Sequence, residues 1–233
     1  MPILNDDTNR NLGRRGFLLL GGAAALSLTG CARIPSRARA LEVAPTQASP
    51  AFGSTSAYAA LPGERFPIPA VDLSQLEPRF RRQMVDYDTA EKPGTVVVDT
   101  ASFYLYHVQP GGQAMRYGVG LGREGFAWSG RANIRWKRAW PTWTPPAEMI
   151  AREPELAKYS AENGGMEPGL QNPLGARALY IFQGGEDTLY RLHGTPEVWS
   201  IGKAVSSGCV RLVNQDVIHL YDNVRSGSPI VVL

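Results

Sequence analysis

The chain contains little cysteine, histidine or charge. Its 233 residues include two Cys and three His, and 19% of them are Asp, Glu, Lys or Arg. No Cys-x-x-Cys pair and no closely spaced pair of His is present, so the sequence lacks the ligand spacing of a structural zinc site. The hydrophobic fraction of 43% is ordinary for a globular protein, and the length allows one sizeable domain with extensions.

A basic domain is also absent, although the formal net charge is +3. Residues 1–41 hold six Arg and two Asp, a balance of +4, so the remainder carries 3 − 4 = −1. Because nucleic-acid binding depends on clustered Lys and Arg, the sequence does not support nucleic acid as a partner.

The basic N-terminus has the composition of an export signal. Arg14-Arg15 is a twin-arginine-like pair, and the uncharged stretch 17–29 that follows spans about 13 residues, short of the ~20 that a membrane-spanning helix requires. Residues 28–31 resemble a lipobox, in which Cys31 would be acylated and become the mature N-terminus. We therefore predict an export signal over residues 1–31 and a location in the periplasm or cell envelope. A lipid anchor at Cys31, which would be the protein's contact with the membrane, and a cleaved soluble form both stay open.

The rest of the chain divides by composition into a tether with a pre-domain segment, residues 32–93, and a compact domain, residues 94–233. Residues 32–63 are rich in Ala, Pro, Ser and Arg without sustained periodicity, which is typical of a flexible linker. Residues 66–89 include apolar side chains, and we expect this part to pack on the domain as a short helix.

Short β-branched and aromatic runs between glycine and proline turns predict a mainly β domain with a few short helices. Residues 118–130 form a glycine-punctuated loop, and residues 134–143, with three Trp and Pro141, cannot form a regular helix. The expected strands are residues 95–99, 103–108, 114–119, 178–182, 189–193 and 230–233, and the expected helices are residues 146–159, broken at Pro154, and 216–224.

One pair of residues indicates chemistry: His193, and Cys209 sixteen residues later (209 − 193). A thiol attacks a carbonyl as a thiolate, so we expect an acidic Cys209 with His193 as its base. Gly208 leaves room beside the sulfur for backbone N–H groups that would hold an oxyanion. Arg211 would bind a substrate carboxylate or brace the loop.

From these residues alone, a buried and unreactive thiol remains as plausible as a nucleophile. His107 falls in an expected strand and His219 on an expected helix, so neither is placed beside the thiol. A metal site built on His193 and Cys209 would lack further ligands.

The segment Ser206-Ser207-Gly208-Cys209-Val210-Arg211, preceded by His193-Gly194-Thr195, resembles the signature of the L,D-transpeptidase catalytic domain, the YkuD family. That signature is a His-Gly pair followed later by Ser-x-Gly-Cys-(Ile/Val)-Arg. The chain also resembles the family in further segments, which occur in the family's order: residues 96–99, 105–106, 117–122, 141–146 and 172–180. The resemblance covers about residues 94–233 and implies a β-sandwich-type catalytic domain.

The resemblance also implies roles for the site residues. Cys209 would be the nucleophile and His193 the proton donor and acceptor, oriented by the Gly194 carbonyl, while amides around Gly208 hold the oxyanion. Ser207 stands where many family members have His, which removes any role for a second imidazole. Supporting positions would be those of Gly194, Ser206, Ser207, Gly208 and Arg211.

The implied reaction forms 3→3 cross-links in peptidoglycan through a cysteine thioester. The donor would be a tetrapeptide stem and the acceptor the side-chain amine of diaminopimelate on a second stem. This chemistry needs neither a metal nor an organic cofactor. The aromatic residues between positions 122 and 143 would wall the donor groove or pack in the core.

Other functions are compatible with the same motif. Water as acceptor would give an L,D-carboxypeptidase, and a lysine would attach a protein to peptidoglycan. A non-catalytic peptidoglycan-binding module is an alternative of another class, but it has no use for His193 and Cys209. A sortase-type transpeptidase fits the contiguous Gly-Cys-Val-Arg run less well.

Overall fold

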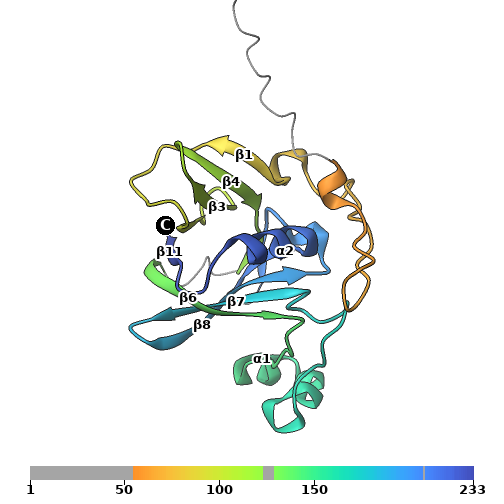
Figure 1. The fold of residues 1–233 in the computed structure, drawn as a ribbon. Coiled ribbons are helices and arrows are strands. Elements are labelled where there is room, and N and C mark those ends of the chain that lie inside the picture. Colours follow the sequence, from red (N-terminus) through yellow and green to blue (C-terminus); the bar gives the residue numbers. More distant parts are fainter. Residues whose placement is uncertain (1–54, 123–128, 207) are drawn as a thin grey trace, which may run out of the picture. The chain divides into compact units, whose positions relative to one another are not determined.

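The computed structural model describes residues 55–122, 129–206 and 208–233 (Figure 1). The predicted export signal with Cys31, most of the predicted tether, and Ser207 lie outside these ranges.

The described residues form mainly β structure with short helices, as the sequence predicts. One sheet has nine strands in the order β1-β4-β3-β2-β11-β6-β7-β8-β10, and β5 pairs separately with β9. None of the described helices is both long and apolar enough to cross a membrane. The strands are β1 (Gln83–Asp86), β2 (Val96–Asp99), β3 (Tyr104–Gln109), β4 (Gln113–Gly118), β5 (Leu121–Gly122), β6 (Gly130–Ala139), β7 (Arg177–Gln183), β8 (Glu186–Thr195), β9 (Ala204–Ser206), β10 (Val210–Val213) and β11 (Pro229–Val232). The helices are α1 (Ala147–Arg152) and α2 (Asn214–Asn223), with 3-10 turns η1 (Thr55–Tyr58), η2 (Pro78–Phe80), η3 (Pro154–Tyr159), η4 (Ala161–Asn163) and η5 (Val198–Ser200).

Each strand and helix predicted within residues 94–233 is present with bounds shifted by a few residues. The predicted helix over residues 146–159 is divided at Pro154 into α1 and η3, since proline has no N–H to continue the helical ladder. Residues 134–143, predicted only to be non-helical, belong largely to β6. Besides β6, the strands that the sequence did not predict are β1, β5, β9 and β10, and β5 lies where a glycine-punctuated loop was expected.

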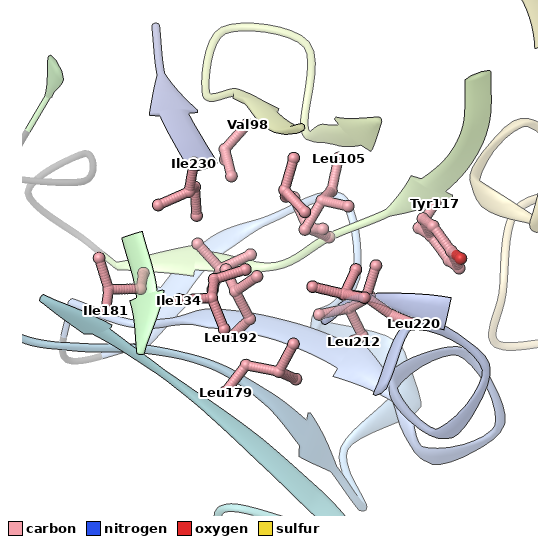
Figure 2. Packing of buried hydrophobic residues seen from close by; sticks show 14 of the residues in the cluster. Val98, Leu105, Tyr117, Ile134, Leu179, Ile181, Leu192, Leu212, Leu220 and Ile230 are labelled. Carbon is pink, nitrogen blue, oxygen red and sulfur yellow. The ribbon is translucent and has the colours of Figure 1, made fainter. Parts of the chain in front are cut away.

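The sheet folds over so that its two halves share one core. Val98 on β2 and Leu105 on β3 belong to the same buried cluster as Leu179 on β7 and Leu192 on β8, although these strands are far apart in the strand order. Figure 2 shows these side chains converging, with Leu220 of α2 beside them. Each such fully buried leucine contributes roughly 1.5–3 kcal/mol to folding. This arrangement confirms the predicted sandwich-type fold.

The segment before residue 94 packs on the domain, but not as the predicted helix. Prolines at positions 67, 69 and 78 interrupt the helical ladder, so helical structure within residues 66–89 is limited to η2. β1 pairs antiparallel with β4 and so extends the sheet by one strand. Tyr58 and Phe80 are buried, and both share a cluster with Ile201 and Val213 of the domain.

A buried polar contact also holds this segment to α2. The Tyr58 hydroxyl donates to Oδ2 of Asp216 at 3.1 Å, and the Arg82 guanidinium lies 3.4 Å from Oδ1 of the same carboxylate. Burial raises the pKa of Asp216 to about 7, against the opposing effects of the Arg82 charge and the Tyr58 hydrogen bond. The segment is therefore joined to the domain by both apolar and polar groups.

Candidate active site

The register of β8 and β10 brings the two predicted catalytic positions together. These strands are parallel neighbours in which Val210 pairs with Leu192 and Arg211 pairs with His193. Residue 209 therefore comes next to Arg191. The Cα atoms of residues 193 and 209 are separated by one strand spacing of ~4.8 Å across the sheet and two residues, about 6.6 Å, along it.

The same register places the two side chains on one face of the sheet. Side chains alternate along a strand, and the alternate set on β8 and β10 is fully buried in the core. The other face therefore carries Arg191, His193, Cys209 and Arg211. Consistent with this placement, the positive charges of Arg191 and Arg211 act to lower the pKa of both the Cys209 thiol and the His193 imidazole. The core set is Leu192, Val210 and Leu212.

The hydrogen bond of His193 fixes its tautomer. Its Nδ1 lies 2.6 Å from the carbonyl oxygen of Gly194, the contact that the family resemblance implies. A carbonyl oxygen only accepts hydrogen bonds, so Nδ1 carries the proton and donates it. The Nε2 atom is then unprotonated and can accept a proton from a thiol.

A bulge in β8 shapes the surroundings of the sulfur. The pairing of β7 with β8 shifts register between Tyr180 and Phe182, and Leu189 within the bulge has a φ of 63°. The Leu189 N–H donates to Asp187 Oδ1 at 2.9 Å, which holds this left-handed residue in place. The Leu189 carbonyl oxygen then lies 4.0 Å from the sulfur of Cys209. Bulges of this kind re-aim backbone groups beside functional sites.

The turn before the nucleophile position depends on two glycines. Gly208 has a φ of 123°, a conformation that side chains strongly disfavour. Gly122 on β5 lies so close that a Cβ added there would be 2.6 Å from both the Cα and the backbone nitrogen of Gly208. The position of Cys209 is thus set by direct backbone packing between β5 and this turn.

The electrostatics differ from the expectation of an acidic thiol. Burial raises the pKa of Cys209, and this outweighs the lowering by the Arg191 backbone hydrogen bond and by the charges of Arg191 and Arg211. Burial also lowers the pKa of His193 to about 4, with the two arginines adding to the lowering and the Gly194 hydrogen bond opposing it. At neutral pH the resting pair is therefore a neutral thiol and a neutral imidazole, because desolvation disfavours both ions.

Arg211 is held by groups that the sequence did not reveal. Its guanidinium pairs with Glu197 at 2.6 Å, and its Nε is buried without a hydrogen-bond partner among the described residues. Its backbone N–H and carbonyl pair with Gly120 at 2.8 and 2.9 Å. Arg211 is thus fixed beside His193 rather than extended into solvent.

The remaining predicted positions are distributed as follows. Ser206 is the last residue of β9 and pairs with Gly122, while Ser207 lies outside the described residues. The described ranges contain no group of three His, Cys, Asp or Glu side chains able to hold a metal ion. Sequence reasoning missed Arg191, Leu189 and Gly122, because their placement follows from strand register and a bulge that no local motif marks.

Comparison with known proteins agrees with this geometry. Residues 93–232 match the family model of the L,D-transpeptidase catalytic domain, YkuD. The probable L,D-transpeptidases ErfK/SrfK and YcfS of Escherichia coli K12 are 32% and 34% identical to the chain over 158 and 148 residues. These matches cover 65% and 59% of the chain but 47% and 43% of the relatives, so the chain spans just under half the length of each.

One solved structure shares more of the sequence. A Brucella melitensis protein described as a probable carnitine operon oxidoreductase is 44% identical, with 70% of this chain and 99% of that one covered and a TM-score of 0.47. That description applies to the Brucella protein alone. The family model spans more than half of the chain, and the protein therefore belongs to the YkuD family, the proteins that carry the L,D-transpeptidase catalytic domain.

Proposed function

We propose that the protein is an L,D-transpeptidase that forms 3→3 cross-links between peptidoglycan stem peptides in the bacterial periplasm. The observation that carries this proposal is the placement of His193 and Cys209 on one sheet face, with the imidazole fixed by Gly194 so that Nε2 is free to accept a proton. We infer that residues 1–31 direct export, with Cys31 as the site of lipid attachment.

The first half of the reaction acylates the thiol. His193 Nε2 takes the proton of Cys209 as the sulfur attacks the carbonyl carbon between diaminopimelate and the terminal D-alanine. Backbone N–H groups near residues 208 and 209 hold the developing oxyanion. His193 then gives the proton to the leaving amine, D-alanine departs, and a thioester remains on Cys209.

The second half transfers the acyl group. The side-chain amine of a second stem attacks the thioester, His193 removes one proton from that amine, and the thiolate leaves and is reprotonated. Since the resting pair is neutral, proton transfer accompanies attack rather than preceding it. The reaction consumes no redox equivalent and needs no metal.

The test uses purified peptidoglycan and its tetrapeptide muropeptide. Wild-type protein incubated with the tetrapeptide should gain the mass of the stem minus D-alanine, and its products should include 3→3 dimers by mass spectrometry. Cys209→Ser, which changes only sulfur to oxygen, is the matched control and should show neither product. If the wild type yields neither adduct nor dimers nor shortened stems while Cys209 is reduced, the proposal is wrong.

A further inference from the structure

The sheet face that carries His193 and Cys209 continues across β8, β7 and β6. Tyr180 pairs with Arg191, and Trp136 pairs with Tyr180. Residues paired across antiparallel strands point to the same face, so these side chains share the face of Cys209. The Trp136 and Tyr180 rings are stacked, with centroids 3.7 Å apart and planes 7° from parallel.

The side chains of Trp136, Tyr180 and Arg191 form a row across this face. Arg191 is the member of the row nearest the thiol, and its side chain is held in place by several contacts. Its guanidinium binds both carboxylate oxygens of Asp187, at 2.7 and 2.8 Å, and donates to the Tyr190 carbonyl at 2.9 Å. It also lies over the Tyr180 ring, 4.4 Å from the centroid. With its charge matched by Asp187, Arg191 serves as a rigid wall of the row rather than as a free cation.

Arg138 is the opposite case. It is exposed, lies 5.7 Å from the centroid of Trp136, and pairs in register with Ala178, which itself pairs with His193. Its Cα is therefore two strand spacings, about 10 Å, from that of His193. Among the described residues it has no acidic partner.

The charge of Arg138 reaches the same row. The pKa of Tyr180 is raised by burial, and the charges of Arg191 and Arg138 act against that rise, so both guanidinium groups lie near the phenol. Two other basic residues of β6 are paired: Arg131 with Glu91, and Lys137 with backbone carbonyls at the end of α2. Arg135 is also exposed, but it lies over the Phe182 ring, 5.5 Å from the centroid, rather than beside the Trp136–Tyr180 stack. On this strand, Arg138 combines a free positive charge with an exposed aromatic surface, since Trp136 is 38% exposed.

We propose that Arg138, supported by the Trp136–Tyr180 stack, binds a free carboxylate of the stem peptide and so orients that peptide toward Cys209. The inference rests on the proposed function for the identity of the peptide. Two features favour an acidic peptide: the complementary charge of Arg138 and the continuity of the row with the candidate active site. We assign this carboxylate to the stem residue that precedes diaminopimelate, which stays on the acyl side of the scissile bond when D-alanine departs. Arg138 is a positioning residue and takes no part in bond making.

The test is a binding measurement that requires no catalysis. In a Cys209→Ser background, isothermal titration compares a tetrapeptide stem whose second residue has a free carboxylate with the same stem amidated there. The acid should bind roughly tenfold more tightly than the amide, as a charge-assisted hydrogen bond predicts. Adding Arg138→Gln should remove that preference without changing the affinity for the amide.

Arg131→Gln is the matched control, since it removes the same charge from the same strand at an exposed ion pair. It should leave the preference for the acid intact. Equal binding of acid and amide, a preference that survives Arg138→Gln, or no binding of either stem overturns the proposal. So does equal loss in both variants together with binding of dextran sulfate, which would show a general polyanion surface. If the preference depends on Arg138 but the wild type forms no thioester, this inference stands and the proposed function fails.

Discussion

The substitution Gly122→Ala tests whether the thiol is positioned by backbone packing between β5 and the turn at residue 208. The added Cβ would lie 2.6 Å from two backbone atoms of Gly208, whereas ordinary contact begins at 3.4 Å. The turn before Cys209 would have to move by roughly 0.8 Å (3.4 − 2.6), because neither backbone atom can rotate away as a side chain could. Gly122 itself has no left-handed φ, so the contact is the main obstacle to alanine.

The expected loss of activity exceeds the expected loss of stability. Overpacking of this kind costs about 1–3 kcal/mol, which lowers the Tm of a domain of this size by ~2–4 °C per kcal/mol. A misplacement of about 1 Å at a reacting atom reduces the rate up to ~100-fold. We therefore expect thioester formation to slow by roughly 10- to 100-fold in protein that remains folded at 25 °C.

The assay follows the acyl-enzyme by intact-protein mass spectrometry after mixing with the tetrapeptide stem, alongside a thermal unfolding curve. Gly169→Ala is the matched control, since a Cβ there meets no atom within 4 Å and its φ is ordinary. Acylation of Gly122→Ala at the wild-type rate, or an equal loss in Gly169→Ala, would refute the reasoning.

Three further predictions concern pH and stability. Because the base must be neutral and burial lowers the pKa of His193 to about 4, activity should persist down to about pH 4, and an acid limb of kcat/KM near pH 6.5 would contradict this. Tyr58→Phe removes the donor to Asp216 and should cost about 1–3 kcal/mol by urea unfolding. That hydrogen bond favours the ionised carboxylate, whose pKa is about 7, so the loss should be larger at pH 8 than at pH 5; a loss independent of pH would be contrary evidence. Phe80→Ala removes a buried ring and should lower the free energy of unfolding by about 3–5 kcal/mol. A loss below about 1 kcal/mol would show that packing of the segment before residue 94 contributes little to stability.

The sequence predicted the strands and helices that have a strong local pattern. The β-branched run of β2 and the apolar periodicity of α2 are determined by neighbours along the chain, so both could be identified from the residues alone. β1 and β10 are as short as β2 but lack its unbroken β-branched run, and they are stabilised by pairing with β4 and β8. Their existence follows from tertiary contacts.

The same distinction applies to the site. The positions of His193 and Cys209 could be inferred from a short motif, because the chemistry of acyl transfer restricts the residue types. The expected acidic thiol was wrong in direction, since burial is a property of the folded environment and outweighs the nearby arginines. Arg191 and Arg138 could not be recognised from sequence, because each owes its place to cross-strand register rather than to neighbours in the chain.

The two outermost strands of the nine-stranded sheet also bear on self-association. An unpaired strand border is a template on which a second molecule can add its own strand. One edge strand is β1, which is only four residues long. The other edge strand is β10, and on its outer side Arg211 already exchanges backbone hydrogen bonds with Gly120. Deletion of residues 55–86 would expose the six-residue strand β4 as a new edge, together with apolar side chains. Such a fragment should aggregate at concentrations where the longer protein stays monodisperse.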